Sequence, residues 1–161
     1  MAIPDHALTK NSRAPAGERS ANAAVIGSRL RSTDELVDAR LVARIEELAR
    51  EAELDEGYTV PTSAAKACLR ERVRRLTRHW SDRAGSELPG YDLDIEDDGT
   101  LTCEWETDDY RLVWFCLPDG SNRIHQLDRR GPRAKTVVYT PDPTLHQVRR
   151  ALELMYCQGR G

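Results

Sequence analysis

Apolar and polar residues alternate along the segment from Tyr91 to Tyr139, a pattern typical of strands that bury one face. Turn residues interrupt this alternation at Asp97-Asp98-Gly99, Asp108-Asp109, Pro118-Asp119-Gly120 and Arg130-Gly131-Pro132. Aspartate followed by glycine is a strong signal for a tight turn between two neighbouring strands. The segment therefore predicts roughly five antiparallel strands connected as a β-meander.

The turns also predict the register of the strands. If Asp108-Asp109 is a two-residue loop, Trp105 lies opposite Leu112, Cys103 opposite Trp114 and Leu101 opposite Cys116. The turn at Pro118-Asp119-Gly120 then sets Trp114 opposite Ile124. Because all these pairs are apolar and lie on one side, we expect that side to face the core, with Trp105 and Trp114 inside it.

Helical periodicity appears before and after the strands. Ser32 and Glu35 form a capping box that predicts a helix from about Ser32 to Gly57, with apolar residues Val37, Leu41, Ile45, Leu48 and Ala52 along one face. A second helix, capped by Thr62 or Ser63, should reach about Arg83 and bury Ala65, Leu69, Val73, Leu76 and Trp80. A third helix is expected from about Thr144 to Tyr156 with the stripe Leu145, Val148, Leu152 and Met155.

These elements predict an α+β fold with two N-terminal helices, a roughly five-stranded antiparallel meander and a C-terminal helix packing on one sheet face. Residues 32–161 form a single domain in this interpretation. Residues 1–31 lack a sustained period and are expected to be an extended or disordered arm, with Val25, Ile26 and Leu30 as its only apolar anchors.

Several residues around the predicted strands also occur together in a known pattern. They are Asp55-Glu56-Gly57-Tyr58 with Pro61, the alanines Ala64, Ala65 and Ala67, then Pro89, the run Asp98-Gly99-Thr100-Leu101-Thr102-Cys103-Glu104-Trp105, and Pro118-Asp119-Gly120. The pattern resembles an uncharacterised family of small bacterial proteins, with a Gly-x-Leu-x-x-Glu-Trp strand after a Pro-capped helix. The resemblance covers roughly residues 55–156. It supports the fold and implies no catalytic residue.

Charge is distributed unevenly along the chain, although the net charge is only −3. Seven cations and two anions lie between Ala64 and Arg83, whereas nine carboxylates and no cation lie between Tyr91 and Asp109. Arg70, Arg74 and Arg78 share one side of the second helix, and Arg129, Arg130 and Arg133 belong to a second basic segment from 123 to 135. These arginines are the candidate contacts for nucleic acid or for an acidic partner, with the nine carboxylates as an intramolecular counterweight. The sequence suggests no exposed series of aromatic residues for stacking bases.

Residue types with catalytic or metal-binding chemistry show no characteristic spacing. The four histidines lack zinc-binding spacing, no two cysteines form a C-x-x-C pair, and the acidic turns do not match a calcium loop, so no metal, cofactor or catalytic residue is predicted. We expect the histidines at the surface and the four cysteines to be small buried side chains. The first twenty residues lack the apolar core of a signal peptide, and no apolar run is long enough to span a membrane, so a cytoplasmic protein is expected.

Two functional hypotheses follow. The first is a non-enzymatic protein-interaction module, such as an antitoxin-like, defence-accessory or regulatory subunit, with a protein partner or a homo-oligomer. It rests on the separated acidic and basic segments and on an arm long enough to wrap a partner. The alternative is a nucleic-acid-binding protein that uses the arginine-rich second helix and the 123–135 segment.

Overall fold

The computed structural model describes residues 18–130 and 135–157, and the side chains of residues 35–130 and 139–157. The chain divides into two units at Val37/Asp38. Helix α1 (Glu18–Leu54) belongs to the first unit up to Val37 and to the second from Asp38 onward. All tertiary contacts described below lie within the second unit.

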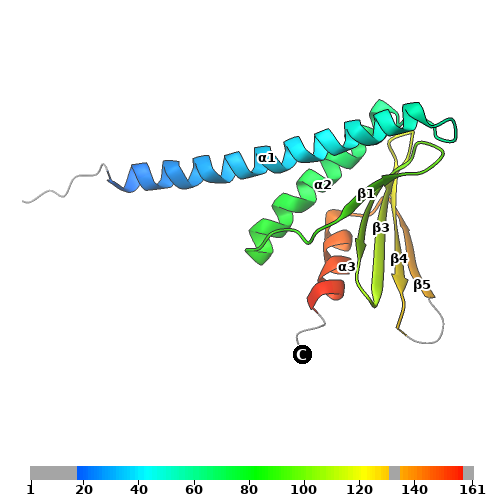
Figure 1. Cartoon of the computed structure of the whole chain (residues 1–161). Coiled ribbons are helices and arrows are strands. Elements are labelled where there is room, and N and C mark those ends of the chain that lie inside the picture. The colour runs from blue at the N-terminus through cyan, green and yellow to red at the C-terminus, as the bar shows by residue number, and fades with distance from the viewer. Residues whose placement is uncertain (1–17, 131–134, 158–161) are drawn as a thin grey trace, which may run out of the picture. The chain divides into compact units, whose positions relative to one another are not determined.

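Among the described residues, a five-stranded antiparallel sheet forms one layer of the second unit (Figure 1). Its strands are β1 (Asp92–Ile95), β2 (Leu101–Glu106), β3 (Tyr110–Cys116), β4 (Asn122–Asp128) and β5 (Lys135–Pro141), and their order in the sheet is the order in the chain. Helix α2 (Ser63–Ala84) precedes the sheet and helix α3 (Leu145–Cys157) follows it. The predicted α+β meander with flanking helices is therefore confirmed.

The start of the first helix differs from the prediction. Helix α1 begins at Glu18, so the expected start at Ser32 is wrong, and residues 18–31 are helical instead of extended or disordered. The capping box of Ser32 and Glu35 lies inside the helix and does not begin it. The side chains of Val25, Ile26 and Leu30 lie outside the described side chains, as do residues 1–17 altogether, so the predicted arm anchors stay a prediction.

Helix α2 has well-defined ends. The Thr62 hydroxyl oxygen accepts a hydrogen bond from the Ala65 N–H at 3.0 Å, which confirms the predicted cap, and donates to the Pro118 carbonyl at 2.6 Å. At the other end Gly85 adopts a left-handed conformation with φ 62°, and its N–H donates to the Ser81 carbonyl. The Thr62 hydroxyl therefore also links the start of α2 to the turn between β3 and β4.

The register of the sheet agrees with the prediction at every predicted pair. Trp105 lies opposite Leu112, Cys103 opposite Trp114, Leu101 opposite Cys116, and Trp114 opposite Ile124. The turn before β2 needs Gly99, whose φ of 83° is left-handed, and Asp98 stabilises it by accepting a hydrogen bond from the Thr100 N–H at 2.8 Å. Local turn chemistry and the apolar pattern thus select the same pairing.

The core lies between the inner face of the sheet and the helices. Trp105 and Trp114 are fully buried there, as predicted, and the five predicted residues of α2 are all buried. Both indoles are satisfied: Trp105 Nε1 donates to the Pro89 carbonyl at 3.2 Å and Trp114 Nε1 to Asn122 Oδ1 at 2.8 Å. Apolar residues of α1 beyond Asp38 and of α3 join the same core, namely Leu41, Ile45, Leu48, Ala52, Val148, Ala151 and Leu152.

Candidate interaction surfaces

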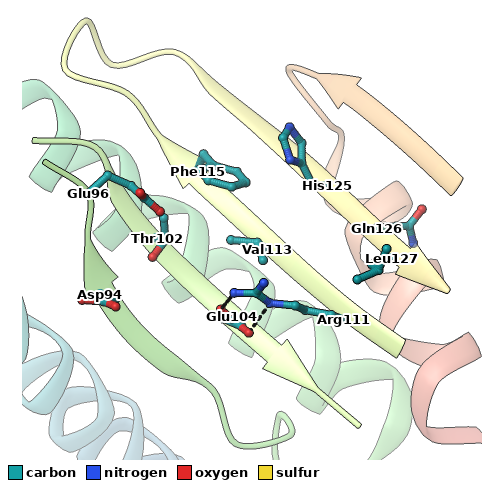
Figure 2. A pocket seen from close by; sticks show the side chains of 10 residues that line it. All are labelled: Asp94, Glu96, Thr102, Glu104, Arg111, Val113, Phe115, His125, Gln126 and Leu127. Atoms are coloured by element: carbon teal, nitrogen blue, oxygen red, sulfur yellow. Dashed lines mark hydrogen bonds and ion pairs between the residues drawn. The ribbon is translucent and has the colours of Figure 1, made fainter. Parts of the chain in front are cut away.

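The opposite side of the sheet, which we call the outer face, carries the side chains that alternate with the core residues. Figure 2 shows the part of it that forms a pocket across β1 to β4, lined by Asp94, Glu96, Thr102, Glu104, Arg111, Val113, Phe115, His125, Gln126 and Leu127. Arg123 and Tyr139 belong to the same face by register. The pairing shifts between Gln126 and Leu127, which explains why these two successive side chains both reach the pocket.

Three rings form a row across β3, β4 and β5 on the outer face. The ring centroids of Phe115 and His125 are 4.7 Å apart, and those of His125 and Tyr139 are 5.2 Å apart, with interplanar angles of 53° and 56°. The Arg123 guanidinium lies 5.1 Å from the Phe115 centroid, within cation–π range. Tyr139, at the end of the row, is 56% exposed. We call Phe115, His125 and Tyr139 the aromatic row.

The sequence-based expectation of no exposed aromatic series did not name the aromatic row, in which Tyr139 is exposed and Phe115 and His125 are half-buried. The signal was present in the predicted register, because Trp114 and Ile124 face the core and their neighbours Phe115 and His125 must then face outward. Burial, and to a lesser extent the charge of Arg123, lower the pKa of His125 below its ordinary value of 6.5. The ring is therefore neutral at neutral pH.

The β1 and β2 side of the outer face is acidic. Arg111 binds Glu104 through two hydrogen bonds, one of them from Nη2 to Oε2 at 2.7 Å (Figure 2). The partner of Glu104 therefore lies on the neighbouring strand β3. Asp94 and Glu96 are exposed and form no ion pair with any residue that the structure describes.

The predicted arginines Arg70 and Arg74 of α2 each bind a carboxylate. Arg70 binds Asp38 with two hydrogen bonds of 3.2 and 2.7 Å, and Arg74 binds Glu71 at 2.9 Å. The hydrogen bond from Arg70, and then the charges of Arg70, Arg74 and Arg78, lower the pKa of Asp38. Neither Asp38 nor Glu71 belongs to the acidic segment that the sequence suggested as counterweight, so that expectation is wrong for Arg70 and Arg74.

The second basic segment lies on the sheet. Arg129 pairs with Glu106, which does belong to the predicted acidic counterweight. Arg130 binds Asp128 with hydrogen bonds of 3.1 and 2.8 Å and lies 4.6 Å above the centroid of Tyr110. Arg133 lies outside the described residues. The two predicted basic groups therefore lie in different parts of the fold, on α2 and directly after β4, and Arg70, Arg74, Arg129 and Arg130 each have a carboxylate partner.

The cysteines depart from the expectation of four buried side chains. Cys103 and Cys116 are buried, Cys68 is half-buried and Cys157 is exposed. A hydrogen bond from the Cys116 thiol, and then the nearby Arg72, lower the pKa of Cys68, while burial raises the pKa of Cys103. Cys157 is exposed because it ends α3, one residue beyond its last partly buried position.

Comparisons with known proteins give no family for this chain: no family model, no curated protein and no solved structure matches it. The resemblance to a family of small bacterial proteins stays a prediction. In the described part of the chain, no three His, Cys, Asp or Glu side chains gather as metal ligands would. Across the described residues, no helix is long and apolar enough to cross a membrane.

Proposed function

We propose that this chain is a non-enzymatic protein-interaction module that contacts its partner through the outer face. The observation that carries the proposal is the composition of that face. Half-buried Phe115, His125 and Leu127 and exposed Tyr139 lie next to charged side chains, in the mixture of aromatic and polar groups that protein interfaces favour. An antitoxin-like, defence-accessory or regulatory subunit in the cytoplasm would use such a surface.

Affinity purification of the tagged chain from its own host, with and without nuclease, tests this function. We expect a protein that survives nuclease treatment and that is lost from the double variant Phe115→Ser/Tyr139→Ser. Leu154→Ser is the matched control, because Leu154 is an apolar residue of α3 that is 43% exposed. Equal recovery by the double variant and wild type would overturn the outer face as the contact surface, and no recovered protein at all would overturn the interaction module.

Nucleic-acid binding is the second candidate, and two observations favour it. Arg70, Arg74 and Arg78 recur at four-residue spacing on one side of α2, and the aromatic row with Arg123 offers ring faces on which bases stack. Against it, Arg70 and Arg74 are already paired with carboxylates.

Fluorescence anisotropy with a labelled single-stranded RNA or DNA of mixed sequence distinguishes this candidate. Binding that weakens steeply with salt and disappears in Arg70→Glu/Arg74→Glu/Arg78→Glu would support it. Binding that survives these changes would assign the nucleic acid to another surface. A complete absence of binding would overturn nucleic-acid binding as a function.

A further inference from the structure

The outer face consists of two chemically different halves. On the β1–β2 side the pocket presents Asp94, Glu96 and Glu104, and on the β3–β5 side the aromatic row begins with Phe115. Figure 2 shows these carboxylates and the Phe115 and His125 rings on the same side of the sheet. A single bound segment that crosses the strands would therefore meet both carboxylates and rings.

The carboxylates make the pocket net acidic. Three carboxylates and one arginine line it, and that arginine, Arg111, is engaged by Glu104. His125 is mainly neutral at neutral pH, because burial lowers its pKa below the ordinary value of 6.5. Asp94 and Glu96 are thus two charges without an ion-pair partner among the described residues. Such a pocket attracts a cation and repels phosphate.

The rings favour one kind of cation. A guanidinium stacks on aromatic faces and also accommodates carboxylates with paired N–H donors. Arg123 above Phe115 and Arg111 on Glu104 are intramolecular examples of these two contacts on this same face. Val113, which is 8% exposed, lies between Glu104 and His125 and gives the floor of the pocket an apolar centre.

We propose that the outer face binds a basic protein segment, in which arginine or lysine side chains alternate with apolar ones. The cations lie against Asp94 and Glu96, and the apolar residues lie over Val113 and Phe115. This inference rests on the proposed function and gives its partner a chemical class. The experiments below are expected to give a different result if the outer face binds a neutral or acidic partner, a second copy of the chain or a nucleic acid.

Nuclear magnetic resonance with the ¹⁵N-labelled full chain tests the inference. The probe is an eight-residue capped peptide of alternating arginine and valine, and the control peptide has glutamate in place of arginine. We expect the arginine peptide to shift the amide resonances of residues 94–96, 102–104, 113–115 and 123–127, and the glutamate peptide to leave them unchanged. Equal shifts with both peptides, or shifts confined to other residues, would overturn the inference.

Charge reversal tests the role of the carboxylates. Asp94→Lys/Glu96→Lys should raise the Kd for the arginine peptide about tenfold or more, because two attractions become repulsions. Glu53→Lys/Glu56→Lys is the matched control, since it makes the same change in net charge at two exposed residues outside the sheet and should leave Kd within about twofold of wild type. The amide spectra of both variants check that the fold is intact. An unchanged Kd in the first variant would overturn the inference.

Combining this test with affinity purification separates the two proposals. One outcome is that wild type and Asp94→Lys/Glu96→Lys capture a partner equally while Phe115→Ser/Tyr139→Ser loses it. That result would support the proposed interaction module and overturn the inference of a basic partner segment. If the arginine peptide binds but no partner is captured, the preference of the outer face for basic segments would stand and the proposed interaction module would be overturned. Two other results would overturn the assignment to a basic partner segment. One is a dimer, detected by light scattering, that dissociates on charge reversal. The other is displacement of the peptide from the outer face by a single-stranded 12-nucleotide DNA.

Discussion

The two faces of the sheet differ although they are made by the same strands. Trp114 and Phe115 are consecutive residues of β3, yet Trp114 is fully buried beneath the helices while Phe115 is partly exposed beside His125 and Arg123. The inner face is almost wholly apolar, whereas the outer face combines rings with ion pairs such as Glu104–Arg111. Because alternate residues have these separate environments, stability and binding should respond to different substitutions.

The largest expected contrast comes from truncating the two neighbouring rings. Trp114→Ala should lower the free energy of unfolding by about 3–5 kcal/mol, because it leaves a cavity in the core. Phe115→Ala should lower it by about 1 kcal/mol, since its ring is only partly buried. Urea denaturation followed by far-ultraviolet circular dichroism measures both values. Similar losses for the two variants would show that the outer face contributes to stability as much as the core does.

Replacement of a polar residue on the inner face should cause the next largest loss of stability. Asn122 is 4% exposed and its Oδ1 accepts the hydrogen bond of the Trp114 indole at 2.8 Å. Asn122→Ala leaves that buried N–H without its acceptor and should cost about 1–3 kcal/mol. Arg123→Ala, the next residue and on the outer face, is the matched control and should cost about 0.5 kcal/mol. If urea unfolding finds the control equally damaging, the indole hydrogen bond has little net value.

The ion pair of the outer face should contribute less. The side chains of Glu104 and Arg111 are 22% and 43% exposed, so solvent screens their attraction. Glu104→Gln should lower the free energy of unfolding by about 0.2–1 kcal/mol, and the loss should shrink as salt is added. A double-mutant cycle with Arg111→Gln isolates the pair. A coupling that does not change with salt would contradict the screened, surface character of this pair.

The smallest expected effect is the pH dependence that arises from His125. Its pKa is lower in the folded chain than the ordinary value of 6.5, so the unfolded chain takes up the proton first as the pH falls. The contribution of His125 to the free energy of unfolding should therefore be constant above that value and decrease as the pH falls from it to the lower folded pKa. His125→Asn should remove this component when unfolding curves are compared from pH 8 to pH 5. If the free energy of unfolding changes with pH equally in wild type and in His125→Asn, other titratable groups cause the pH dependence.

Local sequence rules predicted most of the second unit. The buried stripe of α2, its cap at Thr62 and the register of β2, β3 and β4 agree with the structure residue by residue. The start of α1 was missed because the prediction relied on apolar periodicity, and residues 18–31 have no sustained period. Those residues nevertheless include alanine and arginine, which favour helix without any apolar stripe.

The candidate surfaces were predicted less completely. The sequence placed Arg70, Arg74 and Arg78 on one side of a helix, which the structure confirms, but it gave Arg70 and Arg74 the wrong counterweight. Asp38 is 32 residues from Arg70 in the chain, and only the packing of α1 on α2 within the second unit brings the two together. Cys157 was expected to be buried and is exposed, since residue type alone does not reveal where a helix ends.

The sequence by itself determined which residues face the core, because the alternation of strands and the repeat of helices are local properties of a few consecutive residues. It also determined the register of β2, β3 and β4, because turn residues and matched apolar pairs select one alignment. Only the tertiary structure decided which outer side chains touch. Phe115 contacts His125 as a diagonal neighbour, and His125 lies directly opposite Tyr139, so the row depends on three paired strands that no single stretch of sequence encodes.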